Sequence, residues 1–371
     1  MKGAVAGAVA GAVTGALNRR RAAGLLLAAL ASAVAGRWGP VAAADVAASP
    51  LPAADAEPID FIALGDMPYG TDLLSGPAYR HLIDQINALN LPFAIHVGDF
   101  KAGTSPCTDD EFERQHRHFQ RFAHALVYTP GDNDWLDCHR QGDDPLERLQ
   151  ALRRRFFAGP QSLGPHPLPL ERQGDVMPAF SRYVENQRWL HRGVVLATFH
   201  TVGPDNGSRA RQADVRAESL AREAANAAWI RDSFALARRL QARALVLATQ
   251  AETLGRPQPL QPPQPGLPRV ARVGDGFALS ITQTLLPLAE AAPFPTLLIH
   301  GDNHSYVVDQ PFRNARHELI SQLWRLQVFG EPKLHAVRVR IEPAGSRQPF
   351  SFSPVWNLMS AVPQALQRAP A

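Results

Sequence analysis

The sequence predicts an α/β fold built on parallel strands. Three observations indicate this fold: short apolar runs recur along the chain, acidic turns follow most of these runs, and amphipathic helical stretches separate them. Strands that alternate with helices favour parallel pairing, because a parallel connection needs a long crossover. The 371 residues, 45% of them apolar, are enough to bury a large core.

The first half of the chain supplies three predicted strands, at 61–64, 93–97 and 125–128. Helices are predicted between them at 77–89 and 109–122, where apolar residues recur at helical spacing. Each strand ends shortly before an acidic turn: Gly65-Asp66, Gly98-Asp99, and Gly131-Asp132-Asn133-Asp134. The pattern predicts that the chain returns repeatedly to the same edge of a sheet.

The second half repeats the pattern with strands at 194–199, 244–248 and 296–299 and a long helix at 218–240. The last of these strands runs into His300-Gly301-Asp302-Asn303-His304. The stretch 256–268, which contains six prolines, is predicted to be a surface loop. The tail, with strands at 334–341 and 350–352, is predicted to add antiparallel strands that finish a second sheet.

The N-terminal segment 1–44 has the features of an export signal. It contains no Asp or Glu, carries a triple arginine, and passes through the apolar stretch 22–36 to a small-residue exit. A membrane anchor is the alternative, although the stretch is short for a span. An early start codon and twin-arginine export stay open. The predicted organisation is therefore signal 1–44, Ala/Pro-rich leader 45–58, main domain 59–355 and tail 356–371, with a periplasmic or secreted location and no stable membrane span after cleavage.

Charge argues against a nucleic-acid surface. The precursor has 38 basic and 34 acidic residues, and removal of 1–44 leaves 33 basic and 34 acidic ones. A nearly neutral mature chain offers no concentrated basic face. No heptad pattern indicates an oligomer.

The two cysteines, Cys107 and Cys138, are predicted to form a disulfide, because both remain after signal removal and an oxidising compartment favours pairing. Two free thiols are the alternative. Each cysteine follows one of the Gly-Asp motifs, so a bridge would tie two loops of the predicted site together.

Acidic and amide side chains follow the strands directly. They are Asp66, Asp99, Asp132, Asp134, Gln250, Glu252 and Asp302, with His304 beside the last. Any one of these motifs alone is more often a turn than a ligand. Several carboxylates gathered at one sheet edge would repel one another unless a cation compensates. The sequence therefore predicts a cation site there.

The order and spacing of these motifs over about residues 60–305 resemble the calcineurin-like metallophosphoesterase superfamily. That family's pattern is Asp-x-His, Gly-Asp, Gly-Asn-His-Asp/Glu, a lone His and Gly-His-x-His. Asp66, Asp99, Asp134 and His304 agree with it. The departures are Pro68, Asp132, Asn133, Gln250 and Asp302, so the chain resembles a divergent member of the family that lacks several ligand histidines. Tyr69, next to Pro68, is a candidate substitute oxygen donor.

The resemblance implies a β-sandwich of two mixed sheets flanked by helices and a site for divalent metal ions. Two ions are expected, drawn from Mn, Mg, Fe, Ca and Zn, with the oxygen-rich donor set favouring Mg, Mn or Ca over Zn. The expected ligands are Asp66, Asp99, Asp132, Gln250, Asp302 and His304, and Asp99 would bridge the ions that activate a water.

The expected catalytic residues are Asn133, Asp134, His200 and Lys101. Asn133 cannot donate a proton as the family's histidine does, so His200, His139 or Tyr69 takes that role, or the leaving group needs little help. Lys101 could place an ammonium where a metal charge normally sits. His200 has a core role as its alternative, His96 is expected to be structural, and Trp135 and Trp229 are expected to be packing residues.

The predicted function is metal-dependent hydrolysis of a small-molecule phosphate ester, either a monoester or a diester. The alternative is a protein of the same fold that has lost catalysis and acts as a binding or scaffold protein, which the missing histidines favour. Carboxyl or amide groups at every motif favour the enzyme. Loops such as 159–174 and 256–268 would decide the substrate.

Overall fold

The structure is a computed structural model that describes residues 57–71, 73, 75–255 and 272–360. All of them belong to one of the two units into which the chain divides, residues 50–371. The predicted export segment 1–44, nearly all of the leader 45–58, the loop 256–268 and residues 361–371 of the tail lie outside the described residues. In the part that is described, no helix is long and apolar enough to cross a membrane.

The first sheet has five strands in the order β12-β11-β1-β2-β3. Its middle strand, β1, pairs in parallel with β2 on one side and antiparallel with β11 on the other, where Phe61 lies opposite Val339. Strands β2 and β3 are parallel, and β11 and β12 are antiparallel. The bounds are β1 Ile59–Leu64, β2 Phe93–His96, β3 Ala125–Tyr128, β11 Ala336–Ile341 and β12 Phe350–Val355.

The second sheet has seven strands in the order β4-β5-β6-β7-β8-β10-β9. Strands β6, β7, β8 and β10 form a parallel centre, and the antiparallel strands β4, β5 and β9 complete its two sides. The bounds are β4 Glu171–Arg172, β5 Gln187–His191, β6 Val194–Thr198, β7 Ala244–Ala248, β8 Thr296–His300, β9 Val307–Asp309 and β10 Leu323–Gln327.

The helices begin at recognisable sequence signals. Thr108 caps α3 by accepting a hydrogen bond from the Glu111 N–H, and Asp144 caps α4, whose first residue is Pro145. The bounds are α2 Gly76–Ala88, α3 Asp109–Phe119, α4 Pro145–Phe156, α5 Gln173–Val176, α6 Ala213–Arg239 and α7 Leu286–Glu290, with the 3-10 turns η2 Leu136–Gln141, η3 Pro178–Phe180 and η4 Asp275–Phe277 and the π-helix η5 Ala278–Leu285.

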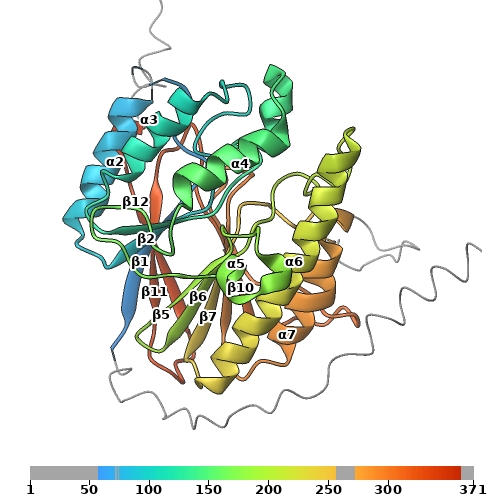
Figure 1. Ribbon diagram of the computed structural model, residues 1–371. Helices are drawn as coiled ribbons and strands as arrows, with labels where there is room; N and C mark the ends of the chain where they lie inside the picture. The colour runs from blue at the N-terminus through green and yellow to red at the C-terminus, as the bar shows by residue number, and fades with distance from the viewer. Residues whose placement is uncertain (1–56, 72, 74, 256–271, 361–371) are drawn as a thin grey trace, which may run out of the picture. The chain divides into compact units, whose positions relative to one another are not determined.

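The two sheets pack face to face with helices outside them. Along β1, Phe61 and Ala63 join the core between the sheets, whereas Ile62 and Leu64 point the other way, into the core beneath α2, α3 and α4. A third core lies between the second sheet and α6, η5 and α7. Figure 1 shows α2, α3 and α4 on one side of the strands and α6 and α7 on the other. Both sheets are thus buried on both faces, which explains the continuous apolar runs.

The structure confirms the predicted fold class, an α/β sandwich of two mixed sheets flanked by helices. The prediction for the tail was wrong in one respect. Strands β11 and β12 are antiparallel as expected, but they complete the first sheet, beside β1, and not the second. The second sheet is instead completed by β4, β5, β9 and β10, strands that the sequence analysis did not predict.

Candidate functional site

The carboxyl ends of five strands from both sheets meet at one place. The backbone N–H of Asp302, after β8, donates to Asp66 Oδ1, after β1, at 2.9 Å. The side-chain amide of Gln250, after β7, donates to Asp99 Oδ2, after β2, at 3.1 Å and to Asp132 Oδ1, after β3, at 3.0 Å. The predicted strand-end residues are therefore brought together.

The backbone at this edge is strained. Asp66, Asp99, Asp302 and His304 all have positive φ, at 52°, 55°, 78° and 56°. Residues other than glycine adopt this conformation at a cost, and such residues gather at functional sites. Four of the six predicted ligands therefore turn sharply out of their strands into the same space.

Two glycines allow the acidic side chains to approach the neighbouring loops. A Cβ at Gly301 would stand 2.1 Å from Asp66 Oδ2, and a Cβ at Gly131 would stand 2.0 Å from Asp99 Oδ1. Neither contact is sterically possible. Glycine is therefore required at both positions so that the carboxyls of Asp66 and Asp99 can pack against the backbone.

Asp66 and His304 form one side of the site. Asp66 is fully buried, and its Oδ2 has no hydrogen-bond partner among the described residues. His304 Nε2 lies 3.8 Å from Asp66 Oδ1, while His304 Nδ1 lies 2.6 Å from the carbonyl oxygen of Glu331. A carbonyl can only accept, so Nδ1 carries the proton and Nε2 presents its lone pair to the site. A backbone carbonyl on the other ring nitrogen is the usual support of a metal-binding histidine.

Asp99 is the centre of the site. Its Oδ1 accepts the Asn133 N–H at 3.0 Å, and its Oδ2 accepts the Asn133 side-chain amide at 3.0 Å and the Tyr69 hydroxyl at 3.4 Å. The Tyr69 hydroxyl also lies 3.1 Å from His304 Nε2 and accepts the Asn133 amide at 3.0 Å. Tyr69 was only an alternative donor in the sequence analysis, because a tyrosine a few residues beyond a strand-end Gly-Asp has no fixed direction.

The structure contradicts the prediction that Gln250 supplies a ligand oxygen. Its Oε1 accepts the Gly203 N–H at 2.9 Å, which fixes the orientation of the amide. The Nε2 hydrogens therefore point at the site, where they bridge Asp99 and Asp132. Gln250 donates hydrogen bonds to the carboxyls and cannot bind a cation in this arrangement.

Burial and mutual repulsion raise the pKa values of the clustered carboxyls. Burial is the largest cause for Asp66, Asp99 and Asp132, whose pKa values lie well above the usual range, and the neighbouring carboxyls raise them further. Burial also raises the pKa of Asp302 to about 6, against the backbone hydrogen bond from Glu252. Ionising these carboxyls therefore costs free energy, unless a bound cation compensates their charge or they stay protonated.

Asp134 has a role different from the predicted catalytic one. Its two oxygens accept the N–H groups of Asp99, Phe100 and Gly131 at 2.8–3.0 Å and the Tyr128 hydroxyl at 2.7 Å. These four hydrogen bonds hold the second and third motif loops together.

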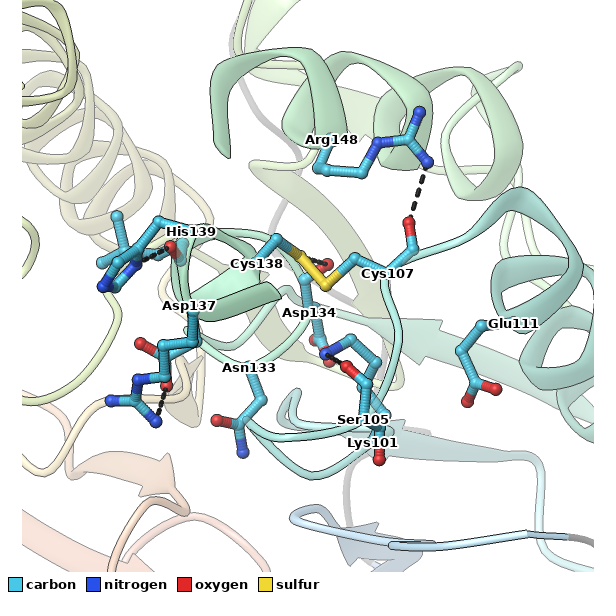
Figure 2. The surroundings of a disulfide bond; sticks show 12 residues. Lys101, Ser105, Cys107, Glu111, Asn133, Asp134, Asp137, Cys138, His139 and Arg148 are labelled. Atoms are coloured by element: carbon cyan, nitrogen blue, oxygen red, sulfur yellow. Dashed lines mark hydrogen bonds and ion pairs between the residues drawn. A yellow bond between two sulfur atoms is a disulfide. The ribbon is translucent and has the colours of Figure 1, made fainter. Parts of the chain in front are cut away.

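Lys101 is likewise turned away from a phosphate. The buried ammonium donates to the carbonyl oxygens of Ala102 at 3.2 Å and Ser105 at 3.3 Å. Burial lowers its pKa, against the attraction of Asp134 and Asp99. Figure 2 shows Lys101 beside Ser105, on the loop that leads to Cys107. The lysine fixes the path of that loop.

His200 closes β6 but belongs to a buried network. Its Nδ1 donates to Glu185 Oε1 at 2.9 Å, and its Nε2 accepts the Trp135 indole N–H at 3.1 Å. Burial, helped by Arg222, lowers the pKa of His200 to about 4. With both ring nitrogens engaged and the ring neutral, the geometry matches the core alternative and does not support the catalytic role.

A disulfide joins two segments of the site. Cys107 and Cys138 are bonded, with their Cα atoms 5.7 Å apart. Figure 2 shows the bridge between the loop that carries Lys101 and the segment that carries Asn133, Asp134, Asp137 and His139. This bridge is the one expected from the sequence.

The chemistry of these residues fits a cation, although the side chains are not arranged as a coordination shell. In the described part of the chain, no three His, Cys, Asp or Glu side chains are placed so that they could hold a metal ion. Asp66 Oδ2 nevertheless has no hydrogen-bond partner among the described residues, and it lies on the carboxyl next to His304 Nε2, which contacts the Tyr69 hydroxyl at 3.1 Å. Carboxylate oxygens and one imidazole suit a divalent cation.

Comparison with known proteins finds no matching family model and no matching curated protein. Among solved structures, the chain is similar to the purple acid phosphatase PPD1 from yellow lupin (Lupinus luteus) seeds, with 11% identity and a TM-score of 0.43 over 87% of this chain and 57% of that one. The chain therefore spans a little over half the length of the lupin protein.

Two further structures are similar to the chain. One is a dimetal phosphatase from Danio rerio, with 11% identity and a TM-score of 0.46 over 83% of this chain and 97% of that one. The other is the protein TT1561 of Thermus thermophilus, with 9% identity and a TM-score of 0.37 over 80% of this chain and 98% of that one.

Proposed function

We propose that this protein hydrolyses phosphate esters with the help of a divalent cation held by Asp66, Asp99, Asp132, Asp302 and His304. The observation that carries the proposal is the gathering of buried carboxyls from four strand ends, whose hydrogen-bond donors are amides and a phenol. Neutral donors do not cancel the charge of ionised carboxylates, so a cation is the natural complement of this edge.

In the proposed reaction, the oxygen of a water molecule bonds to phosphorus, the ester P–O bond breaks, and a proton from the water ends on the departing alcohol. A divalent cation supplies charge neutralisation, polarisation of the phosphoryl group and a more acidic water. The protein supplies orientation: the amide of Asn133 and the hydroxyl of Tyr69 both donate to Asp99 Oδ2 and hold that carboxyl in place.

Tyr69 acts as a hydrogen-bond donor and not as a titrating acid. Burial, followed by the charges of Asp99 and Asp66, raises the pKa of its hydroxyl far above the usual value, so it stays protonated. Asn133 and the buried, neutral His200 offer no transferable proton. The leaving group must therefore depart without a proton from a side chain of the protein. Esters with acidic alcohols are the expected substrates.

Metal analysis combined with turnover tests this proposal. We expect the purified protein to bind Mn, Mg, Zn or Ca with defined stoichiometry and to hydrolyse an aryl phosphate, and Asp99→Asn to abolish both. Asp205→Asn, on the loop after β6, serves as a matched control. Bound metal without turnover of any ester, or turnover that Asp99→Asn leaves intact, would contradict the proposal.

One observation favours the alternative, a binding or scaffold protein of the same fold. Gln250 places a neutral amide between Asp99 and Asp132, so protonated carboxyls could be satisfied without any ion. In that case neither metal binding nor turnover appears with any of the four ions, and Gln250→Ala destabilises the protein because two buried carboxyls lose their shared donor.

An exported location is part of the proposal. The Cys107–Cys138 disulfide supports it, since such bonds persist in oxidising compartments. Determining the N-terminus of the protein recovered from the periplasm or the medium tests it, with cleavage near residue 44 as the expected result and a full-length cytosolic protein as the contradicting one.

A further inference from the structure

We propose that Arg140 binds the phosphate group of the substrate at the rim of the site and selects monoesters over diesters. This inference rests on the proposed function and deepens it, because it names a recognition residue that none of the sequence motifs contains. Arg140 lies near the end of η2, six residues after Asp134.

Arg140 is held in place on one side only. Its Nη1 lies 2.7 Å from Asp137 Oδ2, and its side chain is 50% exposed, whereas Asp137 is almost fully buried. The 3-10 turn that carries both residues also carries Cys138, whose disulfide ties the turn to the loop before α3. A guanidinium has five N–H donors, so the ion pair with Asp137 leaves donors for a second anion.

Gly103 places this guanidinium beside the site. The point where a Cβ at Gly103 would stand is 2.8 Å from Arg140 Nη1, 2.8 Å from Asp137 Oδ2 and 2.5 Å from Asn133 Oδ1. Arg140 and Asn133 therefore flank the same glycine. The other end of the Asn133 amide donates to Asp99 Oδ2, so one asparagine separates Arg140 from the centre of the site.

Four other cationic side chains that the structure describes are engaged elsewhere. Lys101 donates to backbone carbonyls, Arg153 pairs with Glu185 at 2.6 Å, and Arg325 pairs with Glu252 at 2.9 Å. Arg222 is fully buried and pairs with Glu218 at 3.0 Å. Arg140 lies beside the site, its side chain is half exposed, and its guanidinium has N–H groups left for a second anion.

Electrostatics explains why such a residue is needed. The backbone N–H of Asp137 donates to the carbonyl oxygen of Asp132 at 2.9 Å, so the turn that carries Asp137 and Arg140 lies beside the acidic cluster. A phosphate approaching this edge meets negative charge, and Arg140 sits where it can offset that repulsion. A monoester brings more charge and one more terminal oxygen than a diester, so a forked donor at the rim favours the monoester.

The test combines binding and kinetics on the full chain. Arg140→Gln and Arg140→Lys are compared with Arg154→Gln, an exposed arginine on α4 that pairs loosely with Glu147 at 3.7 Å. Binding of inorganic phosphate is measured by calorimetry in the presence of the activating cation. We expect Arg140→Gln to weaken phosphate binding by roughly 10- to 100-fold, Arg140→Lys to weaken it less, and Arg154→Gln to leave it unchanged.

Kinetics on an aryl monoester and an aryl diester complete the test. We expect Arg140→Gln to raise KM for the monoester by a factor similar to the loss of phosphate affinity, with kcat and the diester little changed. Phosphate affinity and monoester preference that survive Arg140→Gln would overturn the inference while leaving hydrolysis intact. Failure of the proposed function is distinct, since the unmodified protein would then hydrolyse neither ester.

Discussion

At the scale of single residues, the site is defined by which donors face it. Asp66, Asp99, Asp132, Asp302 and His304 are gathered through contacts with one another and with Gln250, whereas Asp134, Lys101 and His200 bind other neighbours. Gln250 is the residue whose direction matters most, because its amide turns donors toward two carboxyls. Replacing those donors with an acceptor would change the chemistry of the site.

The substitution Gln250→His tests whether an acceptor at this position changes cation binding. An imidazole nitrogen at this position adds a ligand next to Asp99 and Asp132, so we expect the affinity for Zn²⁺ to rise by about tenfold or more. Calorimetric titration measures the change. Gln241→His, at an exposed position just after α6, should have no effect, and equal affinities for all three proteins would contradict the prediction.

His200 predicts a specific dependence of stability on pH. Its pKa is about 4 in the folded protein, because of burial and Arg222, against 6.5 for the free side chain. The unfolded chain therefore binds a proton that the folded one refuses, and the free energy of unfolding should fall as pH drops from about 6.5 to about 4, by on the order of 3 kcal/mol. His200→Gln should remove this part of the dependence.

Denaturant unfolding at several pH values measures that difference. The exposed His166→Gln variant is the control and should follow the unmodified protein across the whole range. If His200→Gln shows the same pH dependence as the unmodified protein, the ring does not titrate as its burial requires.

The place of a strand-end residue can be predicted from the sequence more readily than the direction of its side chain, for a physical reason. A residue that directly follows a buried strand has few directions available, so Asp66 and Asp99 could be placed. The orientation of Gln250 depends instead on the N–H of Gly203, and that of His200 on Glu185, contacts made through folding that no local pattern records.

At the scale of elements, loops after the strands are packed against one another through glycines. Gly301 leads out of β8 and lets Asp66 Oδ2 approach to within 2.1 Å of the point where a Cβ would stand. The strand-to-loop junctions of β1 and β8 are therefore built as one unit, and a methyl group at the contact would separate them.

Gly301→Ala should displace Asp66 and cost about 1–3 kcal/mol of stability through overpacking. We expect a matching loss of cation binding. Gly159→Ala is the matched control, since no atom lies within 4 Å of its Cβ position. Thermal unfolding with and without added cation distinguishes the two variants, and normal cation binding by Gly301→Ala would show that this contact does not position Asp66.

Strands and helices could be predicted where the local sequence has a clear pattern. They could not be predicted where they form only because a neighbouring strand pairs with them. Strands β3 and β7 have the predicted bounds because continuous apolar runs and turn residues mark both ends. The two-residue β4 and the half-exposed β9 carry no such pattern and exist because a neighbouring strand offers its edge. Helix α6 begins earlier than predicted, at Ala213, because helix-forming residues precede its buried face.

At the scale of the whole molecule, the clustered carboxyls couple cation binding to stability. The pKa of Asp302 is about 6 when folded against 3.8 when free, so its contribution is fully present below about pH 4 and is lost as pH rises through about 6. The more strongly raised pKa values of Asp66, Asp99 and Asp132 extend the loss to higher pH.

A bound cation should therefore stabilise the protein more at about pH 7.5 than at about pH 5, where protons compete for the same oxygens. At a cation concentration a hundredfold above Kd, we expect about 2.7 kcal/mol of stabilisation at the higher pH. Thermal unfolding with Mn²⁺ and with a chelator measures it. Asp99→Asn should lose the effect, and a shift that is larger at acidic pH would contradict the prediction.

The pairing of β1 with β11 has a consequence for how the protein is made. The strand that leads to Asp66 finds its partner near the far end of the chain, where Val339 lies opposite Phe61, and Gly330 and Glu331 contact Asp66 just before that partner strand begins. During synthesis, one edge of β1 stays open until β11 has left the ribosome. The nascent protein therefore cannot assemble its acidic centre early, and a chain cut short before β11 would be a substrate for chaperones and proteases.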